Sequence, residues 1–399
     1  MNSASEQKPF IAIACGGTGG HLFPGVAVAE QLLRQGAAVA LLISPKEVDQ
    51  QAVKSVQGVE IFTLPAVGLQ NRNYFSFAGS FWKSFRLART LFRDHRPQAV
   101  LAMGGFTSAP PVLAAKLAGV KTFLHESNTI PGRANRFLGR FVDEAFVGFP
   151  EAGTRLSVHR VTTTGTPVRP QILVGENPVG DGANGGDPAA CRVALGLDPI
   201  RSTVLVVGGS QGATGLNDLI LAALPRLANR NWQWLHLTGV HDFERVKAVY
   251  AAQGIAAVVK PFLAEMNLAL GAATACVSRA GASSLAELAA CRLPSLLVPF
   301  PAAADNHQFF NATAFANAGA AKLVEQKHAT PENVAAWLIE LVENDETRSK
   351  MRAALIPWHA PAAAAQIADH IMRAVTQTEK TMVPPAESPR AVNSAKAVF

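Results

Sequence analysis

Short apolar runs alternate with longer amphipathic stretches along most of the chain. The runs predict strands at 10–15, 38–43, 59–64, 98–103, 120–125 and 144–147, and again at 203–207, 232–237, 255–259, 274–277, 295–298 and 321–324. Helical periodicity follows most of them, most clearly at 24–34, 215–228 and 283–290. Because strands that alternate with helices form parallel sheets covered on both faces, we expect an α/β protein with doubly wound sheets.

Two glycine clusters, Gly16–Gly20 and Gly208–Gly212, each follow a strand-like run and precede a helix-like stretch. At such a turn the backbone N–H groups of the helix start converge, and glycine lets a phosphate approach them. A tight structural turn is the other interpretation of either cluster alone. The clusters lie 192 residues apart, so we expect two similar domains that face each other across a cleft.

Neither cluster fits the common nucleotide-binding signatures. Neither spells G-x-G-x-x-G, and the strand at 38–43 runs into Ser44-Pro45-Lys46, with no acid at its tip to hold a ribose. No lysine follows either cluster in the P-loop pattern. Dinucleotide-dependent dehydrogenases and NTP hydrolases are therefore disfavoured.

Composition limits the class of protein further. The 399 residues are 49% hydrophobic, enough for two cores, but the apolar runs are shorter than the roughly 18 residues of a membrane span. Residues 1–9 lack a signal-peptide pattern, so we expect a cytoplasmic protein. The four scattered cysteines indicate neither disulfides nor a metal site. The net charge is +7, but no RNA-binding signature accompanies it, so no nucleic-acid partner is expected.

One basic, aromatic stretch stands out between Arg72 and Arg96. A helix at 78–93 would place Phe81, Phe85 and Phe92 on one face and Trp82, Arg86, Arg89 and Arg93 on another. The second face, with two phenylalanines upstream, suits the headgroup zone of an anionic membrane; an ordinary solvated helix face is the alternative. We call these residues the aromatic–basic patch: Phe75, Phe77, Trp82, Arg86 and Arg89.

Seven segments resemble the MurG family of bacterial peptidoglycan glycosyltransferases, in the order of that family, over about residues 10–370. They are Gly16–His21, Gly104–Phe106, His125–Asn128, Gly165–Arg169, Gly208–Ala213, Arg279–Glu287 and Asp305–Gln308. The resemblance implies a GT-B architecture, with two Rossmann-like domains facing across a cleft. It also implies inverting transfer of N-acetylglucosamine from UDP-GlcNAc to undecaprenyl-pyrophosphoryl-MurNAc-pentapeptide (lipid I).

The same resemblance implies where the protein works and how it is divided. We expect a peripheral protein on the cytoplasmic face of the plasma (inner) membrane, with proteins of cell-wall synthesis as candidate partners. The acceptor-binding domain is expected at 1–168, joined by a C-terminal helix at about 353–374, and the UDP-GlcNAc-binding domain at 169–350. Residues 175–188 read as a flexible loop, and 375–399 as a disordered tail.

The donor site is expected on the second domain. A helix that starts at Ala282 can direct its N–H groups and positive end at a diphosphate. Glu287, one turn into that helix, is implied to accept both ribose hydroxyls, although a first-turn acid is the alternative. Further donor residues implied by the resemblance are Ser283, Ser284, Leu285 and Ala286 on the helix, Ser210, Leu263 at the uracil, Arg169 at the diphosphate, and His307, Gln308 and Asn128 at the sugar.

The catalytic residues are expected on the first domain. Thr18, Gly19 and Gly20 form a second anion-binding turn, which holds the lipid I diphosphate or meets the donor. His21 is the expected general base, and Glu126 the carboxylate that orients its imidazole. Without the resemblance, a helix-start histidine and a strand-end polar pair of Glu126 and Asn128 are the simpler interpretations.

Other features of the sequence bear on the chemistry and on the alternatives. No Asp-x-Asp cluster is present, so neither a metal nor another cofactor is expected. Phe106 stands where the family has tyrosine, and Ser127 where glutamine is more usual, so no phenolic hydroxyl is expected there. A GT-B relative with another lipid acceptor, such as diacylglycerol, and a non-catalytic nucleotide-binding scaffold are the alternatives.

Overall fold

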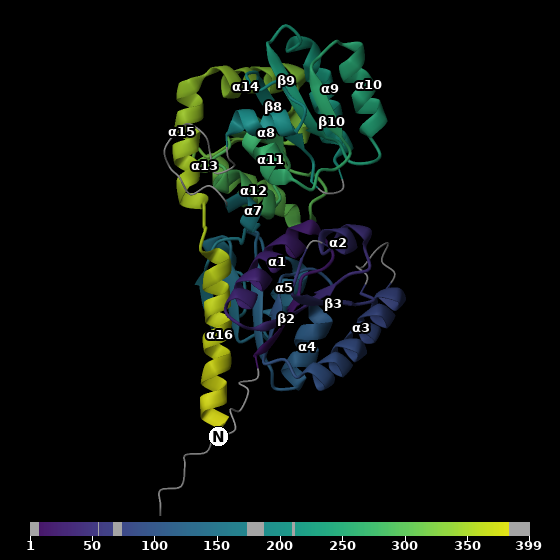
Figure 1. The fold of residues 1–399 in the computed structure, drawn as a ribbon, viewed down its shortest axis with the longest axis vertical. Coiled ribbons are helices and arrows are strands. Elements are labelled where there is room, and N and C mark those ends of the chain that lie inside the picture. The colour runs from purple at the N-terminus through teal and green to yellow at the C-terminus, as the bar shows by residue number, and fades with distance from the viewer. Residues whose placement is uncertain (1–7, 55, 67–73, 174–186, 210–211, 383–399) are drawn as a thin grey trace, which may run out of the picture.

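The protein folds into two domains, each built on a sheet of parallel strands, and the second domain lies above the first in Figure 1. The computed structural model describes residues 8–54, 56–66, 74–173, 187–209 and 212–382. The first sheet has seven strands in the order β3-β2-β1-β4-β5-β6-β7, and the second has six in the order β10-β9-β8-β11-β12-β13. Both have the central reversal of strand order of a doubly wound sheet, so the predicted fold class is confirmed.

The strands lie close to the predicted runs. In the first sheet they are β1 (Phe10–Ala14), β2 (Ala38–Ile43), β3 (Val59–Thr63), β4 (Ala99–Ala102), β5 (Lys121–Glu126), β6 (Glu144–Val147) and β7 (Val161–Thr163). In the second they are β8 (Ser202–Val207), β9 (Trp232–Leu237), β10 (Ala257–Lys260), β11 (Ala275–Ser278), β12 (Ser295–Leu297) and β13 (Lys322–Leu323). The edge strand β7 was not predicted, because its three residues are short of a recognisable apolar run.

Helices connect the strands and cover both faces of each sheet. Those before the second sheet are α1 (Gly19–Arg34), α2 (Glu47–Ala52), α3 (Tyr74–His95), α4 (Ala109–Leu117), α5 (Arg133–Leu138), α6 (Pro150–Gly153), α7 (Pro170–Leu173) and α8 (Pro188–Ala194). The others are α9 (Thr214–Ala223), α10 (Phe243–Ala252), α11 (Met266–Ala272), α12 (Ala282–Ala290), α13 (His307–Asn317), α14 (Pro331–Glu343), α15 (Asp345–Leu355) and α16 (Ala363–Met382).

The central strand β1 shows why the first domain needs helices on both sides. Ile11 and Ile13 belong to the core beneath α1 and α16, whereas Ala12 and Ala14 belong to the core beneath α3 and α4. Successive strand residues point to opposite faces, so a continuous apolar run requires cover on both. All four side chains are fully buried.

The last helix returns to the first domain (Figure 1). Ile367, Ile371 and Val375 on α16 are buried in the core of the first sheet. The helix predicted at 353–374 is thus two separate helices, since α15 ends at Leu355 and α16 begins at Ala363. The predicted disorder from 375 is wrong for 375–382, because Val375 continues the apolar stripe at a spacing of four residues. Residues 383–399 lie outside the described residues.

An aromatic cluster packs the two domains together where the chain crosses between them. Phe149, which immediately precedes α6, lies 5.6 Å from Trp358 and 6.4 Å from Phe315 on α13, measured between ring centroids. The rings of Phe315 and Trp358 are 4.4 Å apart. The predicted domain boundary at 168–169 falls just before α7, and most of the predicted loop at 175–188 lies outside the described residues.

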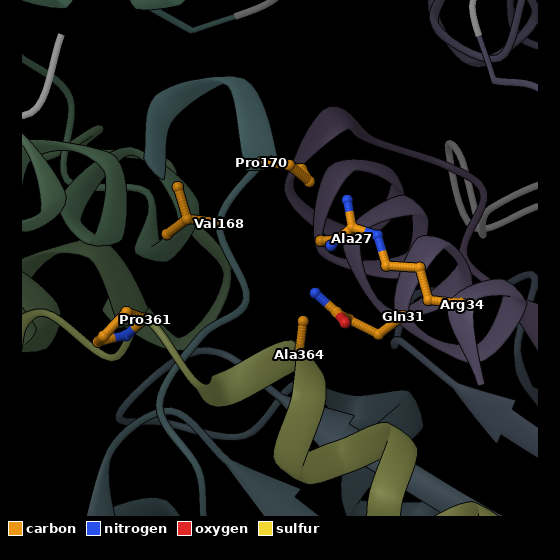
Figure 2. A pocket seen from close by; sticks show the side chains of 7 residues that line it. All are labelled: Ala27, Gln31, Arg34, Val168, Pro170, Pro361 and Ala364. Carbon is orange, nitrogen blue, oxygen red and sulfur yellow. The ribbon is translucent and has the colours of Figure 1, made fainter. Parts of the chain in front are cut away.

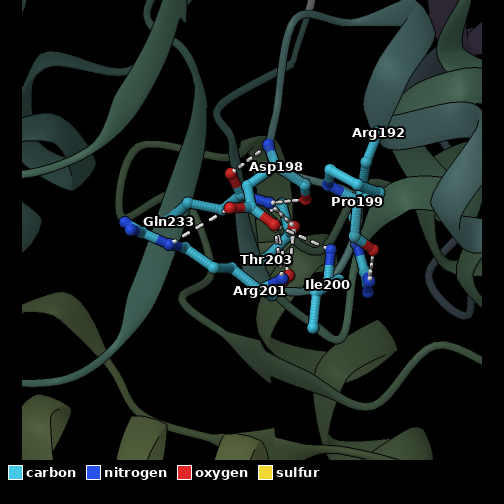
Figure 3. A network of polar contacts seen from close by, with 7 residues as sticks. All are labelled: Arg192, Asp198, Pro199, Ile200, Arg201, Thr203 and Gln233. Carbon is cyan, nitrogen blue, oxygen red and sulfur yellow. Dashed lines mark hydrogen bonds and ion pairs between the residues drawn. The ribbon is translucent and has the colours of Figure 1, made fainter.

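A network of hydrogen bonds connects the residues before the amino end of β8 in the second domain (Figure 3). The Gln233 side chain accepts from the backbone N–H of Asp198 at 2.8 Å, and donates to the carbonyl of Asp198 and to the Thr203 hydroxyl. Arg192 on α8 donates to the carbonyl of Pro199. Because ligands bind at the carboxyl ends of such strands, this network is structural.

A buried histidine network lies inside the second domain. His236 on β9 is fully buried, donates from Nε2 to the Asn217 side chain at 3.0 Å, and accepts at Nδ1 from the Tyr250 hydroxyl at 3.2 Å. Burial lowers the pKa of His236 to about 3, with the charge of Asp242 opposing the shift. Both ring nitrogens are satisfied in the neutral form, so the folded protein holds this imidazole uncharged.

We expect His236 to make the protein sensitive to acid. The pKa of His236 is about 3 in the folded protein and about 6.5 in the unfolded chain. The contribution of this neutral imidazole to the free energy of unfolding is therefore complete above about pH 6.5. It is lost as the pH falls from about 6.5 towards 3. Between about pH 7.5 and pH 5.5 this histidine alone should cost about 1.4 kcal/mol of unfolding free energy. Urea unfolding followed by tryptophan fluorescence measures the loss. The variant His236→Gln should show a shallower pH dependence, and an unchanged slope would contradict the assignment.

Candidate active site

The two predicted anion-binding helix starts lie against each other across the domain boundary. The hydroxyl of Ser283, in the first turn of α12, donates to the carbonyl of Gly20, in the first turn of α1, at 3.0 Å. Both helices follow strands of their parallel sheets, so both begin at a carboxyl edge. The N–H groups of a first helical turn have no partner within the helix, so two sets of donors meet at this junction.

The turn before α1 is held in shape by residues that lie outside the predicted motifs. Asp49 on α2 is fully buried and accepts from the N–H of Gly17 at 2.6 Å and from the Ser44 hydroxyl at 2.5 Å. Lys46 donates to the carbonyl of Gly17 at 2.8 Å. A Cβ at Gly16 would lie 2.2 Å from the backbone nitrogen of Ser44, so only glycine fits. Since Gly17 N–H is occupied, the groups left for an anion start at Thr18.

His21 packs against two glycines at the end of β4. Gly104 and Gly105 have φ values of +104° and +77°, and a Cβ on Gly104 would lie 2.9 Å from Cε1 of the imidazole. Nδ1 of His21 is buried, and a backbone hydrogen bond with Met103 acts on the imidazole. Burial is the main cause of a lowered pKa for His21, although the charge of Glu126 raises it. The imidazole is therefore neutral near pH 7 and can accept a proton.

Glu126, predicted to orient the His21 imidazole, uses its carboxylate for hydrogen bonds within its own loop. Its carboxylate accepts from the backbone and side-chain N–H groups of Asn128, from the N–H of Gly132 and from the Asn135 amide, all at 2.8–2.9 Å. Among the described residues no hydrogen bond joins it to His21. Glu126 therefore shapes the loop after β5, and it acts on the imidazole through its charge. The sequence contained no motif for Asn135, which lies on α5.

Glu287 and Arg169 form a mostly buried ion pair beside the α12 start. Nε and Nη2 of Arg169 both donate to Oε1 of Glu287, at 3.0 and 2.8 Å, and both side chains are less than one-sixth exposed. The guanidinium also lies over the ring of Phe23 on α1, 4.4 Å from its centroid. Burial raises the pKa of Glu287, and Arg169 counteracts the shift. Because both bonds end on Oε1, Arg169 leaves Oε2 for a ligand.

The other predicted donor residues lie along the carboxyl edge of the second sheet. Leu263 is buried in the connection after β10. Oε1 of Gln308 accepts from the N–H groups of Ala280 and Phe300, which fixes the loops after β11 and β12, and Nδ1 of His307 bonds the carbonyl of Ala304. Arg279, which was not predicted to act, donates to the carbonyls of Val298 and Pro299. Ser210 lies outside the described residues.

A separate cavity of about 200 Å³ opens beside the two chain crossings (Figure 2). It is lined by Ala27, Gln31 and Arg34 of α1, by Val168, Pro170 and Pro361 of the crossings, and by Ala364 of α16. None of the predicted site residues lines it. In the described ranges, no group of three or more His, Cys, Asp or Glu side chains is placed to hold a metal ion.

Two facing Rossmann-like domains, with a helix start from each at their junction, form the GT-B architecture of nucleotide-sugar glycosyltransferases. Residues 11–147 match the model of the glycosyltransferase family 28 N-terminal domain, and residues 203–371 that of the C-terminal domain. The chain belongs to this family, and within it to the MurG group of N-acetylglucosamine transferases.

The relatives support that assignment along most of the chain. It is 36% identical over 373 residues to the UDP-N-acetylglucosamine–N-acetylmuramyl-(pentapeptide) pyrophosphoryl-undecaprenol N-acetylglucosamine transferase of Anaeromyxobacter dehalogenans, covering 91% of this chain and 92% of the relative. The crystal structure of Acinetobacter baumannii MurG matches with a TM-score of 0.70 at 27% identity, covering 92% of this chain and all of that one. A UDP-N-acetylglucosamine 2-epimerase shares the fold alone, with a TM-score of 0.67 at 13% identity.

Proposed function

We propose that this chain transfers N-acetylglucosamine from UDP-GlcNAc to the muramyl hydroxyl of undecaprenyl-pyrophosphoryl-MurNAc-pentapeptide, with inversion at the anomeric carbon. The Anaeromyxobacter relative named above carries the transfer of N-acetylglucosamine to this acceptor in its name, and the chain is similar to it over both domains. The observation that carries the proposal is the contact between Ser283 and Gly20, which brings the donor-side and acceptor-side helix starts together beside His21.

The proposed reaction is a single displacement. The acceptor oxygen attacks the anomeric carbon while the bond from that carbon to the UDP oxygen breaks, and the acceptor proton passes to His21. Since Nδ1 is buried, we assign the proton to Nε2. The first-turn N–H groups of α12 and the nearby Arg169 stabilise the charge that develops on the diphosphate. The Oε2 of Glu287 binds the ribose.

An assay with radiolabelled UDP-GlcNAc and a lipid I analogue tests the proposal. Label that enters the lipid supports it. Transfer only to another lipid, such as diacylglycerol, would indicate a GT-B relative with a different acceptor. UDP binding without turnover on any acceptor would indicate a nucleotide-binding scaffold and would contradict the proposal.

We further propose that α3 docks the protein on an anionic membrane, where a lipid acceptor resides. The helix lies at the outside of the first domain (Figure 1), and within the described residues no helix is long and apolar enough to cross a bilayer. Phe75 is 95% exposed and Trp82 53% exposed, while Arg86 and Arg89 are exposed beside them. The opposite face is buried through Phe85 and Phe92, whereas Phe81, which the spacing placed on the same face, is only half-buried.

Replacing Trp82, Arg86 and Arg89 together by alanine should weaken binding to phosphatidylglycerol-containing vesicles at least about thirtyfold, since each arginine near such a surface contributes about 1 kcal/mol. Cosedimentation measures the binding, and the affinity for UDP should stay unchanged. The double variant Lys247→Ala, Lys350→Ala removes the same charge from exposed sites of the second domain and serves as the control. If the triple variant binds vesicles as the control does, α3 is an ordinary solvated helix.

A further inference from the structure

Asn311 on α13 joins the two domains through a fully buried amide. Its Oδ1 accepts from the backbone N–H and from the hydroxyl of Thr129, at 2.9 and 3.0 Å, and Thr129 lies on the first domain. Its Nδ2 donates to Oδ1 of Asn128 at 3.0 Å and to the carbonyl of Ala280 at 3.2 Å. A carboxamide has two acceptor sites and two donor hydrogens, so all four are used. Asn311 therefore has nothing left with which to bind a substrate.

The contact with Asn311 fixes which way the Asn128 amide points. Nδ2 of Asn128 donates to Oε1 of Glu126 at 2.9 Å, and its Oδ1 accepts from Asn311. Turning the amide over would set its oxygen against the Glu126 carboxylate and its N–H group against the Asn311 N–H group. Both contacts would then be repulsive. Asn128 is half-buried, so its second N–H and its second lone pair remain for a ligand in one orientation only.

We propose that Asn311 is a positioning residue, which sets the Asn128 amide from the opposite domain and so completes the subsite for the sugar of the donor. The inference rests on the proposed function and on the contact between Asn128 and the N-acetylglucosamine unit that the family resemblance implies. Asn128 lies on the loop after β5 of the first domain, and Asn311, which holds its amide, lies on α13 of the second. The sugar is therefore recognised only when the two domains are apposed as they are here. UDP, which lacks the sugar, does not require this support.

The isosteric variant Asn311→Asp tests the proposal. Aspartate keeps an acceptor for Thr129 but turns a second oxygen towards Asn128 and Ala280, so both donated hydrogen bonds are lost. Titration calorimetry should show UDP-GlcNAc binding weakened about tenfold, with UDP binding within about twofold of the wild type. The KM for UDP-GlcNAc should rise accordingly. Equal losses for both nucleotides, or no loss for either, would overturn the proposal.

Two further variants separate positioning from loss of structure. Thr129→Val removes one bond to Asn311 but leaves both bonds that its Nδ2 donates, so the ratio of the two affinities should stay close to that of the wild type. Asn311→Ser is neutral and shorter, and it should reproduce the selective loss if the buried charge of Asn311→Asp prevents folding. Wild-type protein that binds neither nucleotide would instead contradict the proposed function, which distinguishes the two failures.

Discussion

His21→Ala should lower kcat by about 10²–10⁴-fold, the range typical of a lost general base. The affinity for UDP should change little, because the imidazole packs on Gly104 and Gly105 of the first domain and makes no described hydrogen bond to the second. Single-turnover transfer to a lipid I analogue measures the chemical step, and calorimetry measures UDP binding. An unchanged turnover, or a loss confined to UDP affinity, would remove His21 from the role of base.

The pH profile gives an independent check on the same residue. A base must be neutral, and burial lowers the pKa of His21, so activity should persist below the pH of about 6.5 at which a free histidine is half protonated. In His21→Ala the acidic limb due to this group should disappear. His159→Ala, which removes an exposed histidine of the same domain, should leave both the rate and the profile as in the wild type.

Most strands were predictable because each is a short apolar run, and those in the middle of the sheets, such as β1, β4 and β11, are buried on both faces. The apolar runs of parallel strands depend little on the rest of the fold, and they were sufficient to predict twelve of the thirteen strands found in the described residues. β7 was not predicted because it has only three residues, of which Val161 alone is hydrophobic. The helix expected from 24 begins at Gly19, because the second pair of glycines forms the first turn of α1 rather than a loop before it.

The site could be predicted only where it rests on local motifs. The glycine turns, His21 and the α12 start are defined by adjacent residues, so the sequence indicated them. Asp49, Asn135 and Asn311 are isolated polar residues whose importance comes from burial and from hydrogen bonds to other elements of the fold. The hydrogen-bond partners of Glu126 also differ from those expected. The sequence suggested that Glu126 orients His21, but its carboxylate oxygens accept hydrogen bonds from its own loop. Such competition for hydrogen bonds is decided by the tertiary structure.

Glu287→Ala should weaken UDP binding by about 10- to 100-fold, because a hydrogen bond to a charged group contributes about 1.5–3 kcal/mol. The same change leaves Arg169 without its carboxylate in a mostly buried place. Its guanidinium can then turn to the diphosphate and attract it more strongly, which offsets part of the lost affinity for UDP. In that case the decrease in affinity should be about tenfold. The rate at saturating UDP-GlcNAc should fall less than the affinity, since Glu287 is assigned to the ribose and not to the reacting atoms.

Glu287→Gln and a surface pair provide the controls for this variant. Glutamine keeps an oxygen for Arg169 but loses the charge, so its affinity for UDP should lie between those of the wild type and the alanine variant. Glu343→Ala breaks an exposed pair with Arg230 in the same domain, which contributes at most about 1 kcal/mol, and should leave UDP binding unchanged. If Glu287→Ala lowered kcat and spared UDP affinity, while His21→Ala did the opposite, the donor and acceptor sides would have to be exchanged. The contact between Ser283 and Gly20 would then join the helix starts in reversed roles.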